Sequence, residues 1–309
     1  MPTVSRYPAP QLLVVLAFAA IYLIWGTTFF VALIGLETLP PYLMMTLRLL
    51  LAGVLLYGVS LLWNQGGPPA SHRAWLRNAV CGILMLGLGS SSVIWSEQYL
   101  PSSLAAILVT TVPLWLALLD WPRWAGYRRD KLRLLGLALG TGGMVALFGG
   151  LPGVLGSGAP APRYWLAVAA IVAGSFCSAT GALLTRYWSV PGPPVRHAAV
   201  QVLAAGLFCA LVSAGVGEWT TFSWAQVSSR SLWAMTYSSV FSSCVAYVAY
   251  VWLLQVRPPA VVGTYAYVNP VVAVGLGWLL AHEPVTGQQV LALTVILSGV
   301  GLLNRPTAT

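Results

Sequence analysis

The chain has 309 residues, of which 58% are hydrophobic and only 7% are charged. A soluble domain carries about 25% charged residues, so this composition excludes a soluble protein and predicts an integral membrane protein. The net charge of +9 does not indicate nucleic-acid binding, because the arginines lie at the ends of apolar runs, where membrane topology explains them. The four cysteines lie far apart inside apolar runs, so we expect neither disulfides nor a metal site.

The apolar runs are separated by polar or Pro- and Gly-rich breaks such as "NQGGPPASHR" and "SVPGPPVR". A helix of about 20 apolar residues crosses a bilayer core, and these runs have that length. The sequence therefore predicts an all-α integral membrane protein with ten transmembrane helices. The predicted spans are 11–34, 42–63, 76–98, 101–120, 133–150, 164–188, 196–216, 231–255, 258–280 and 286–304.

The basic residues predict the orientation of these spans. If the N-terminus is cytoplasmic, most lysines and arginines fall in cytoplasmic loops and tails, and only Arg163 and Arg230 fall in external loops. Arg48 is left over at the start of the second span. This bias follows the positive-inside rule, so we expect both termini to face the cytoplasm.

The fourth and ninth spans carry the same pattern of prolines. Each begins at a proline, Pro101 or Pro258, and has a second proline twelve residues later, Pro113 or Pro270. We infer two five-helix repeats, residues 1–150 and 151–309. Because five is odd, the second copy must enter the membrane from the opposite side. Inverted repeats of this kind are typical of secondary transporters, which bind substrate near the midplane, where the repeats meet.

Three segments also carry a family resemblance: "IYLIWGTTFFV", "SEQYLPSSLAAILVTTVPL" and "YAYVNPVVAVGLGWLLAHEPVT". With the ten-helix count, they resemble the drug/metabolite transporter superfamily, and most closely its EamA-type inner-membrane exporters. The resemblance implies two inverted five-helix repeats, a central cavity lined by the first, third, fourth, sixth, eighth and ninth helices, and export of small metabolites. Family members often have a glutamate after the ninth helix and another after the fourth. Here Glu283 matches the first position, but Gly126 stands at the second.

The prolines inside the spans mark the bilayer centre. Pro270 lies about 18 Å along its helix and frees the carbonyl of Ala266, as Pro113 frees that of Val109. Such carbonyls are tolerated where they line protein or a watery cavity. The two prolines are therefore either structural kinks or a symmetry-related pair of bends that shape or gate a cavity.

Polar and aromatic side chains at the same depth are candidates for the cavity wall. Asn269 needs partners inside the bundle, and either ties helices together or contacts substrate. Tyr265 shares its face, and Trp25 lies too deep for an interfacial belt. The threonine before Pro113 either satisfies the loosened backbone or faces the cavity. The predicted lining residues are Tyr22, Trp25, Thr28, Trp95, Thr110, Tyr265 and Asn269.

Two charged residues remain inside the predicted spans. Glu97 lies near the external end of the third span, and Arg48 lies towards the same side. Glu97 is either solvated or paired with Arg48, as a structural ion pair or a polar gate.

The favoured function is a secondary transporter of the cell (inner) membrane that exports small amphipathic metabolites, such as amino acids, by alternating access. Its partners would be a small-molecule substrate and the lipid bilayer, with no nucleic acid and no cofactor, and the chain would act as a monomer or a homodimer. No Walker motif occurs, which excludes ATP hydrolysis within this chain. An intramembrane enzyme is the alternative, but no GxSxG occurs and His72, His197 and His282 are expected in loops, so we name no catalytic residue. A structural or channel-like subunit remains a third interpretation.

Overall fold

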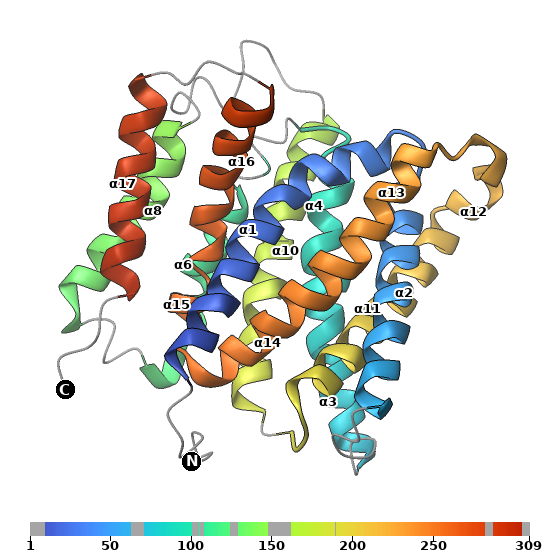
Figure 1. Cartoon of the computed structure of the whole chain (residues 1–309), viewed down its shortest axis with the longest axis horizontal. Helices are drawn as coiled ribbons and strands as arrows, with labels where there is room; N and C mark the ends of the chain where they lie inside the picture. The colour runs from blue at the N-terminus through green and yellow to red at the C-terminus, as the bar shows by residue number, and fades with distance from the viewer. Residues whose placement is uncertain are drawn as a thin grey trace.

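A computed structural model describes residues 10–62, 71–100, 105, 108–123, 129–147, 162–188, 190–281 and 287–304. All regular structure in these ranges is helical (Figure 1). Six of the described helical segments are long and apolar enough to cross a membrane: Gln11–Leu36, Pro41–Leu62, His72–Ser96, Pro162–Tyr187, Pro194–Gly215 and Ser229–Val256. The expected all-helical chain with membrane-length helices is therefore confirmed.

The described helices follow one another with short connections. Those of the first half are α1 (Gln11–Leu36), α2 (Pro41–Leu62), α3 (His72–Gly82), the π-helical η1 (Ile83–Ser90), α4 (Ser91–Ser96), α6 (Thr111–Leu119), η2 (Trp121–Arg123) and α8 (Lys131–Leu147). Those of the second half are α10 (Pro162–Tyr187), α11 (Pro194–Gly215), α12 (Glu218–Thr221), η3 (Trp224–Gln226), α13 (Ser229–Tyr237), the π-helical η4 (Ser238–Ala246), α14 (Tyr247–Val256), α15 (Pro259–Val262), α16 (Tyr265–Ala281) and α17 (Gly287–Asn304).

Long-range helix pairs build the bundle. In Figure 1, α8 and α17 pack together at one end of the molecule, and α2 and α11 pack together towards the other. Between these pairs, α1 packs against α16 and η4, while α10 packs against α6 and η1. The central helices thus come from both halves of the sequence.

Small residues let the paired helices approach closely. A Cβ on Gly53 of α2 would lie 2.6 Å from the Leu203 side chain of α11, and a Cβ on Gly206 would lie 2.9 Å from that of Leu50. The α8–α17 pair has the same character, because a Cβ on Gly136 would lie 2.8 Å from the carbonyl oxygen of Gly299. Close approach through glycine is a common way to pack membrane helices, since it maximises van der Waals contact.

The ninth predicted span is interrupted rather than continuous. It divides into α15 and α16, with a turn at Gly263 and Thr264, and Pro270 lies inside α16. The hydroxyl of Thr264 donates to the carbonyl of Val261 at 2.7 Å, which satisfies one backbone acceptor released by the interruption. In the first half, Pro113 occupies the first turn of α6, where a missing N–H costs no helical hydrogen bond.

Two of the three histidines lie in helices, contrary to the expectation of loops. His72 begins α3, and His197 lies in the first turn of α11 with 5% of its surface exposed. The expectation was wrong because both helices extend further at their N-termini than the apolar runs do. His282, Glu283, Pro101 and Gly126 lie outside the described residues.

Candidate functional site

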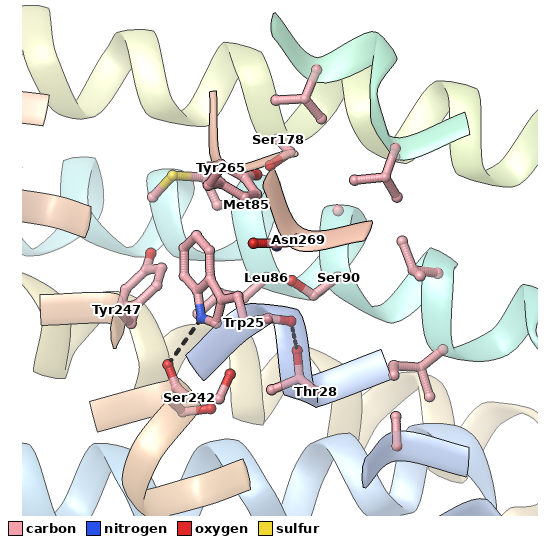
Figure 2. A pocket seen from close by; sticks show the side chains of 18 of the residues that line it. Trp25, Thr28, Met85, Leu86, Ser90, Ser178, Ser242, Tyr247, Tyr265 and Asn269 are labelled. Carbon is pink, nitrogen blue, oxygen red and sulfur yellow. Dashed lines mark hydrogen bonds between the residues drawn. The ribbon is translucent and has the colours of Figure 1, made fainter. Parts of the chain in front are cut away.

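A cavity of about 130 Å³ lies among the central helices (Figure 2). Side chains from α1, α2, η1, α4, α6, α10, η4, α14 and α16 line it, so both halves of the chain contribute. Six of the predicted site residues are among its lining residues: Trp25, Thr28, Arg48, Glu97, Tyr265 and Asn269.

Three aromatic rings in mutual contact form one wall of this cavity. The ring of Trp25 lies 5.1 Å from that of Tyr250 and 4.7 Å from that of Tyr265, and the two tyrosine rings are 5.6 Å apart. The indole Nε1 of Trp25 donates to the carbonyl of Ser242 at 3.3 Å, which holds the ring in place (Figure 2). We call Trp25, Tyr250 and Tyr265 the aromatic wall. Its faces suit an apolar or cationic ligand group.

Thr28 and Asn269 are the polar residues of the cavity nearest to this wall in sequence. The hydroxyl of Thr28 donates to the carbonyl of Trp25 at 2.6 Å, one turn earlier in α1 (Figure 2). With its amide oriented to donate, Asn269 places its nitrogen 3.0 Å from the carbonyl oxygen of Tyr265 and 3.3 Å from that of Tyr22. Asn269 therefore joins α16 to α1 as well as facing the cavity.

Arg48 and Glu97 bring opposite charges to the cavity without touching each other. Arg48 donates from Nε to the hydroxyl of Ser243 at 2.9 Å and from Nη2 to that of Ser242 at 2.7 Å. No ion pair between Arg48 and Glu97 is found in the described part of the chain, where both pairs involve other residues. The ion-pair interpretation is therefore not what the described residues show, and the gate interpretation remains a prediction.

The other predicted residues lie beside the cavity rather than in its wall. The hydroxyl of Tyr22 shares a hydrogen bond with that of Thr264 at 2.6 Å. Trp95 packs on Tyr99, with ring centroids 5.1 Å apart, in a separate apolar cluster. Thr110 directly precedes α6 and is 1% exposed. Pro113 and Pro270 are buried next to cavity-lining neighbours.

The two π-helical segments supply lining residues that the sequence patterns did not single out. Met85, Leu86 and Ser90 come from η1, and Ser242 and Ser243 come from η4. A π-helical turn inserts a residue and leaves backbone carbonyls less regularly bonded, and such turns are frequent at functional sites. The runs "GLGSSS" and "SSVFSS" were the available signal, because glycine and serine are unusual in consecutive positions of a membrane helix.

A second cavity of about 530 Å³ lies beyond the first and has basic side chains, among them Arg77 and Arg123, in its lining. A buried hydrogen-bond chain lies between the two cavities. Tyr247, in the lining of the first, donates to Gln201 Oε1 at 2.8 Å. Gln201 Nε2 in turn donates to Asn78 Oδ1 at 3.2 Å and to Thr185 Oγ1 at 3.4 Å, and both partners line the second cavity.

Comparison with known proteins decides the family. Residues 12–149 and 165–305 match the model of the EamA-like transporter family. The chain belongs to this family. The resemblance to the drug/metabolite transporter superfamily is thereby confirmed, and membership indicates a membrane transporter rather than an enzyme.

The relatives of this EamA-like transporter agree. It is 38% identical to the "Uncharacterized inner membrane transporter YedA" of Escherichia coli (strain K12), over 93% of this chain and 89% of the relative. It is 26% identical to "Protein PecM" of Dickeya dadantii (strain 3937), over 90% of this chain and 87% of that protein. A solved crystal structure with 18% identity superposes with a TM-score of 0.77 over 96% of this chain and 97% of the other, which shows a shared fold.

The hydrogen-bond chain between the cavities of this EamA-like transporter gives a testable prediction. We expect Gln201→Leu to lower the free energy of unfolding by about 1–3 kcal/mol, because it leaves the Tyr247 hydroxyl and the Asn78 amide buried without their partner. Thermal unfolding of the purified protein in detergent measures this. Gln98→Leu is the control, because Gln98 is exposed and bonds only within its own turn. Equal midpoints for the two variants would contradict the prediction.

Proposed function

We propose that this EamA-like protein is a secondary transporter of the inner membrane that exports small amphipathic metabolites, such as amino acids or related compounds, by alternating access. In this proposal ten membrane-spanning helices form two inverted five-helix repeats, residues 1–150 and 151–309, and both termini are cytoplasmic. The observation that carries the proposal is the cavity among the central helices, whose wall combines three aromatic rings with an arginine and a glutamate.

The chemistry of the cavity supports an amphipathic substrate. The aromatic wall offers apolar surface, while Arg48 and Glu97 offer one charge of each sign in the same enclosed space. Ligand sites commonly combine an apolar lining with a few polar groups that set orientation. We therefore assign substrate contact to Trp25, Thr28, Tyr265 and Asn269, with Tyr22, Trp95 and Thr110 holding the lining helices in position.

Reciprocal packing supports the inverted repeat. The Gly53–Leu203 contact and the Gly206–Leu50 contact have the same form with the two halves exchanged, and both pairs are 153 residues apart in corresponding positions. The π-helical segments η1 and η4 likewise lie in the third and eighth predicted spans. The family model also matches one segment in each half of the chain. These relations are expected where two copies of one unit face each other across a two-fold axis.

The pair of cavities supports alternating access. In an alternating-access carrier, the substrate site opens to one side of the membrane at a time. The Tyr247–Gln201–Asn78 chain closes the passage between the aromatic-walled cavity and the basic one. Breaking that chain would join them. The interruptions before Pro113 and Pro270 are the proposed bending points of this motion. The aromatic-walled cavity is complete within one chain, so a single copy supplies the whole site in a monomer or a homodimer.

Counterflow in proteoliposomes tests the proposal. Vesicles containing the purified chain are loaded with an unlabelled compound and diluted into a trace of the same compound in labelled form. The panel would contain amino acids and small amphipathic amines. A carrier accumulates label transiently only when its own substrate is inside. Label entry that ignores the internal compound would indicate a channel-like protein, and chemical conversion of a panel compound would indicate an enzyme. Either result would overturn the proposal.

A further inference from the structure

Glu97 is a carboxylate in the cavity wall without a partner. It directly follows α4, is 9% exposed and lines the cavity. Both its oxygens, Oε1 and Oε2, are buried and have no hydrogen-bond partner among the described residues. An ionised carboxylate in this position would lack both solvation and compensation, which is costly. The carboxyl group is therefore expected to be neutral, or to face a cation held in the cavity.

The protein itself supplies no such cation at bonding distance within the described ranges. Arg48, on α2, directs Nε and Nη2 to the neutral hydroxyls of Ser243 and Ser242. Arg163, at the start of α10, is exposed and stands over the ring of Tyr99 at 6.0 Å. The remaining titratable side chains that face Glu97 across the cavity or from the start of α10 are tyrosines, which are uncharged at neutral pH: Tyr164, Tyr247, Tyr250 and Tyr265.

The aromatic wall fits an organic cation. Trp25, Tyr250 and Tyr265 present ring faces to the same cavity as Glu97, and such faces attract an ammonium group through their quadrupoles. The hydroxyl of Tyr250 is also buried without a partner among the described residues, so it offers a further oxygen acceptor. A carboxylate beside aromatic rings in an enclosed space is a favourable environment for a protonated amine. Arg48, at another point of the wall, would attract an anionic group on the same compound.

We propose that Glu97 binds the protonated amino group of the carried compound, and that it holds a proton when that compound is absent. This rests on the proposed transport function and adds the chemical class of the ligand and the coupled ion. When the ammonium group arrives, the carboxyl O–H bond breaks and the proton leaves for solvent, while the carboxylate accepts hydrogen bonds from the ammonium. One carboxyl group cannot hold both cations. Export of the amine on one side therefore alternates with uptake of a proton.

Calorimetric titration of the purified full chain tests this exchange. The probe is phenethylamine, an aromatic primary amine, and phenethyl alcohol is its uncharged control. Titration in two buffers with different ionisation enthalpies counts the protons released. We expect about one proton released per bound amine at pH values where the empty carboxyl is protonated, and affinity rising about tenfold per pH unit there. The alcohol should bind weakly and release none.

Three variants separate the role of Glu97 from a structural one. Glu97→Gln should abolish proton release and flatten the pH dependence, and Glu97→Asp should restore release at reduced affinity. Glu37→Gln is the matched control, because Glu37 follows α1 outside the cavity and its side chain is 46% exposed. Size-exclusion profiles verify folding.

Proton release that persists in a folded Glu97→Gln variant would overturn the inference. So would counterflow by the wild type that neither amines nor pH affect, and that result would leave the transport function standing. Absence of counterflow for the whole panel would instead count against the transport function itself.

Discussion

Trp25→Ala is expected to reduce the apparent affinity in counterflow by about tenfold or more, because it removes the shared member of the aromatic wall. Trp25 touches both Tyr250 and Tyr265, and its indole nitrogen ties α1 to η4 through Ser242. A single aromatic contact contributes up to about 1.5 kcal/mol beyond its buried area, and tenfold in affinity corresponds to about that much. Initial rates over a range of substrate concentrations measure the change.

Two variants make the Trp25 result specific. Trp25→Phe keeps a ring but removes the N–H, and we expect it to fall between wild type and Trp25→Ala. Phe30→Ala lies on the same helix, but Phe30 is 69% exposed and faces away from the cavity, so its counterflow should match wild type. Equal losses in Trp25→Ala and Phe30→Ala would mean that α1 tolerates no truncation, and would remove support for the wall.

Gly82→Ala is expected to lower the free energy of unfolding by about 3 kcal/mol or more. A Cβ on Gly82 would meet the backbone of Gln201, lying 2.5 Å from its Cα and its carbonyl carbon and close against its oxygen. Backbone atoms cannot rotate away as a side chain does, so α3 and α11 would have to separate. That separation would also disturb the hydrogen bonds of Gln201 between the two cavities.

Gly58→Ala is the matched control for Gly82→Ala. Gly58 is also inside a membrane-length helix, α2, but nothing lies within 4 Å of a Cβ placed there. Alanine at such a site is expected to be neutral or to stabilise the helix by about 0.5–1 kcal/mol. Thermal unfolding in detergent compares the two. Equal stability of Gly82→Ala and Gly58→Ala would contradict the close contact between α3 and α11.

The positions of the long helices were predictable because the bilayer imposes them. A span needs about 20 apolar residues, and the first predicted span, 11–34, corresponds to α1 at Gln11–Leu36. The pairing "RLLLAG" with "QVLAAG" was also visible in the sequence. Its physical counterpart is the exchange of Gly53–Leu203 and Gly206–Leu50 contacts between α2 and α11.

The interruption of the ninth span was misplaced because its cause is tertiary. Pro270 was the obvious breaker, yet α16 continues through it and the chain turns at Gly263 and Thr264. A Cβ on Gly263 would lie 2.6 Å from the side chain of Leu116 in α6. Thr264 is held by the hydroxyl of Tyr22 in α1. Neither contact leaves a local pattern in the sequence.

The cavity residues were predicted where depth and residue type decide, and missed where folding decides. Trp25 and Asn269 stand out as polar or amphipathic residues deep in apolar runs, and both line the cavity. Ser242 and Ser243 did not stand out. They reach Arg48 because η4 packs against α2, a contact across nearly 200 residues that no local spacing reveals. The same contact accounts for an arginine that bonds to serines while Glu97 is left alone.

Protection of a cysteine placed in the cavity tests whether the carried compound binds there. In a background without the four native cysteines, Ser90→Cys puts a thiol on η1 in the cavity wall (Figure 2), and Gln98→Cys puts one on exposed surface. A small thiol reagent is applied to proteoliposomes with and without the compound that gives counterflow. Slower labelling at position 90 with unchanged labelling at position 98 is the expected result. Equal labelling at position 90 with and without a saturating transported compound would show that the compound crosses by another route.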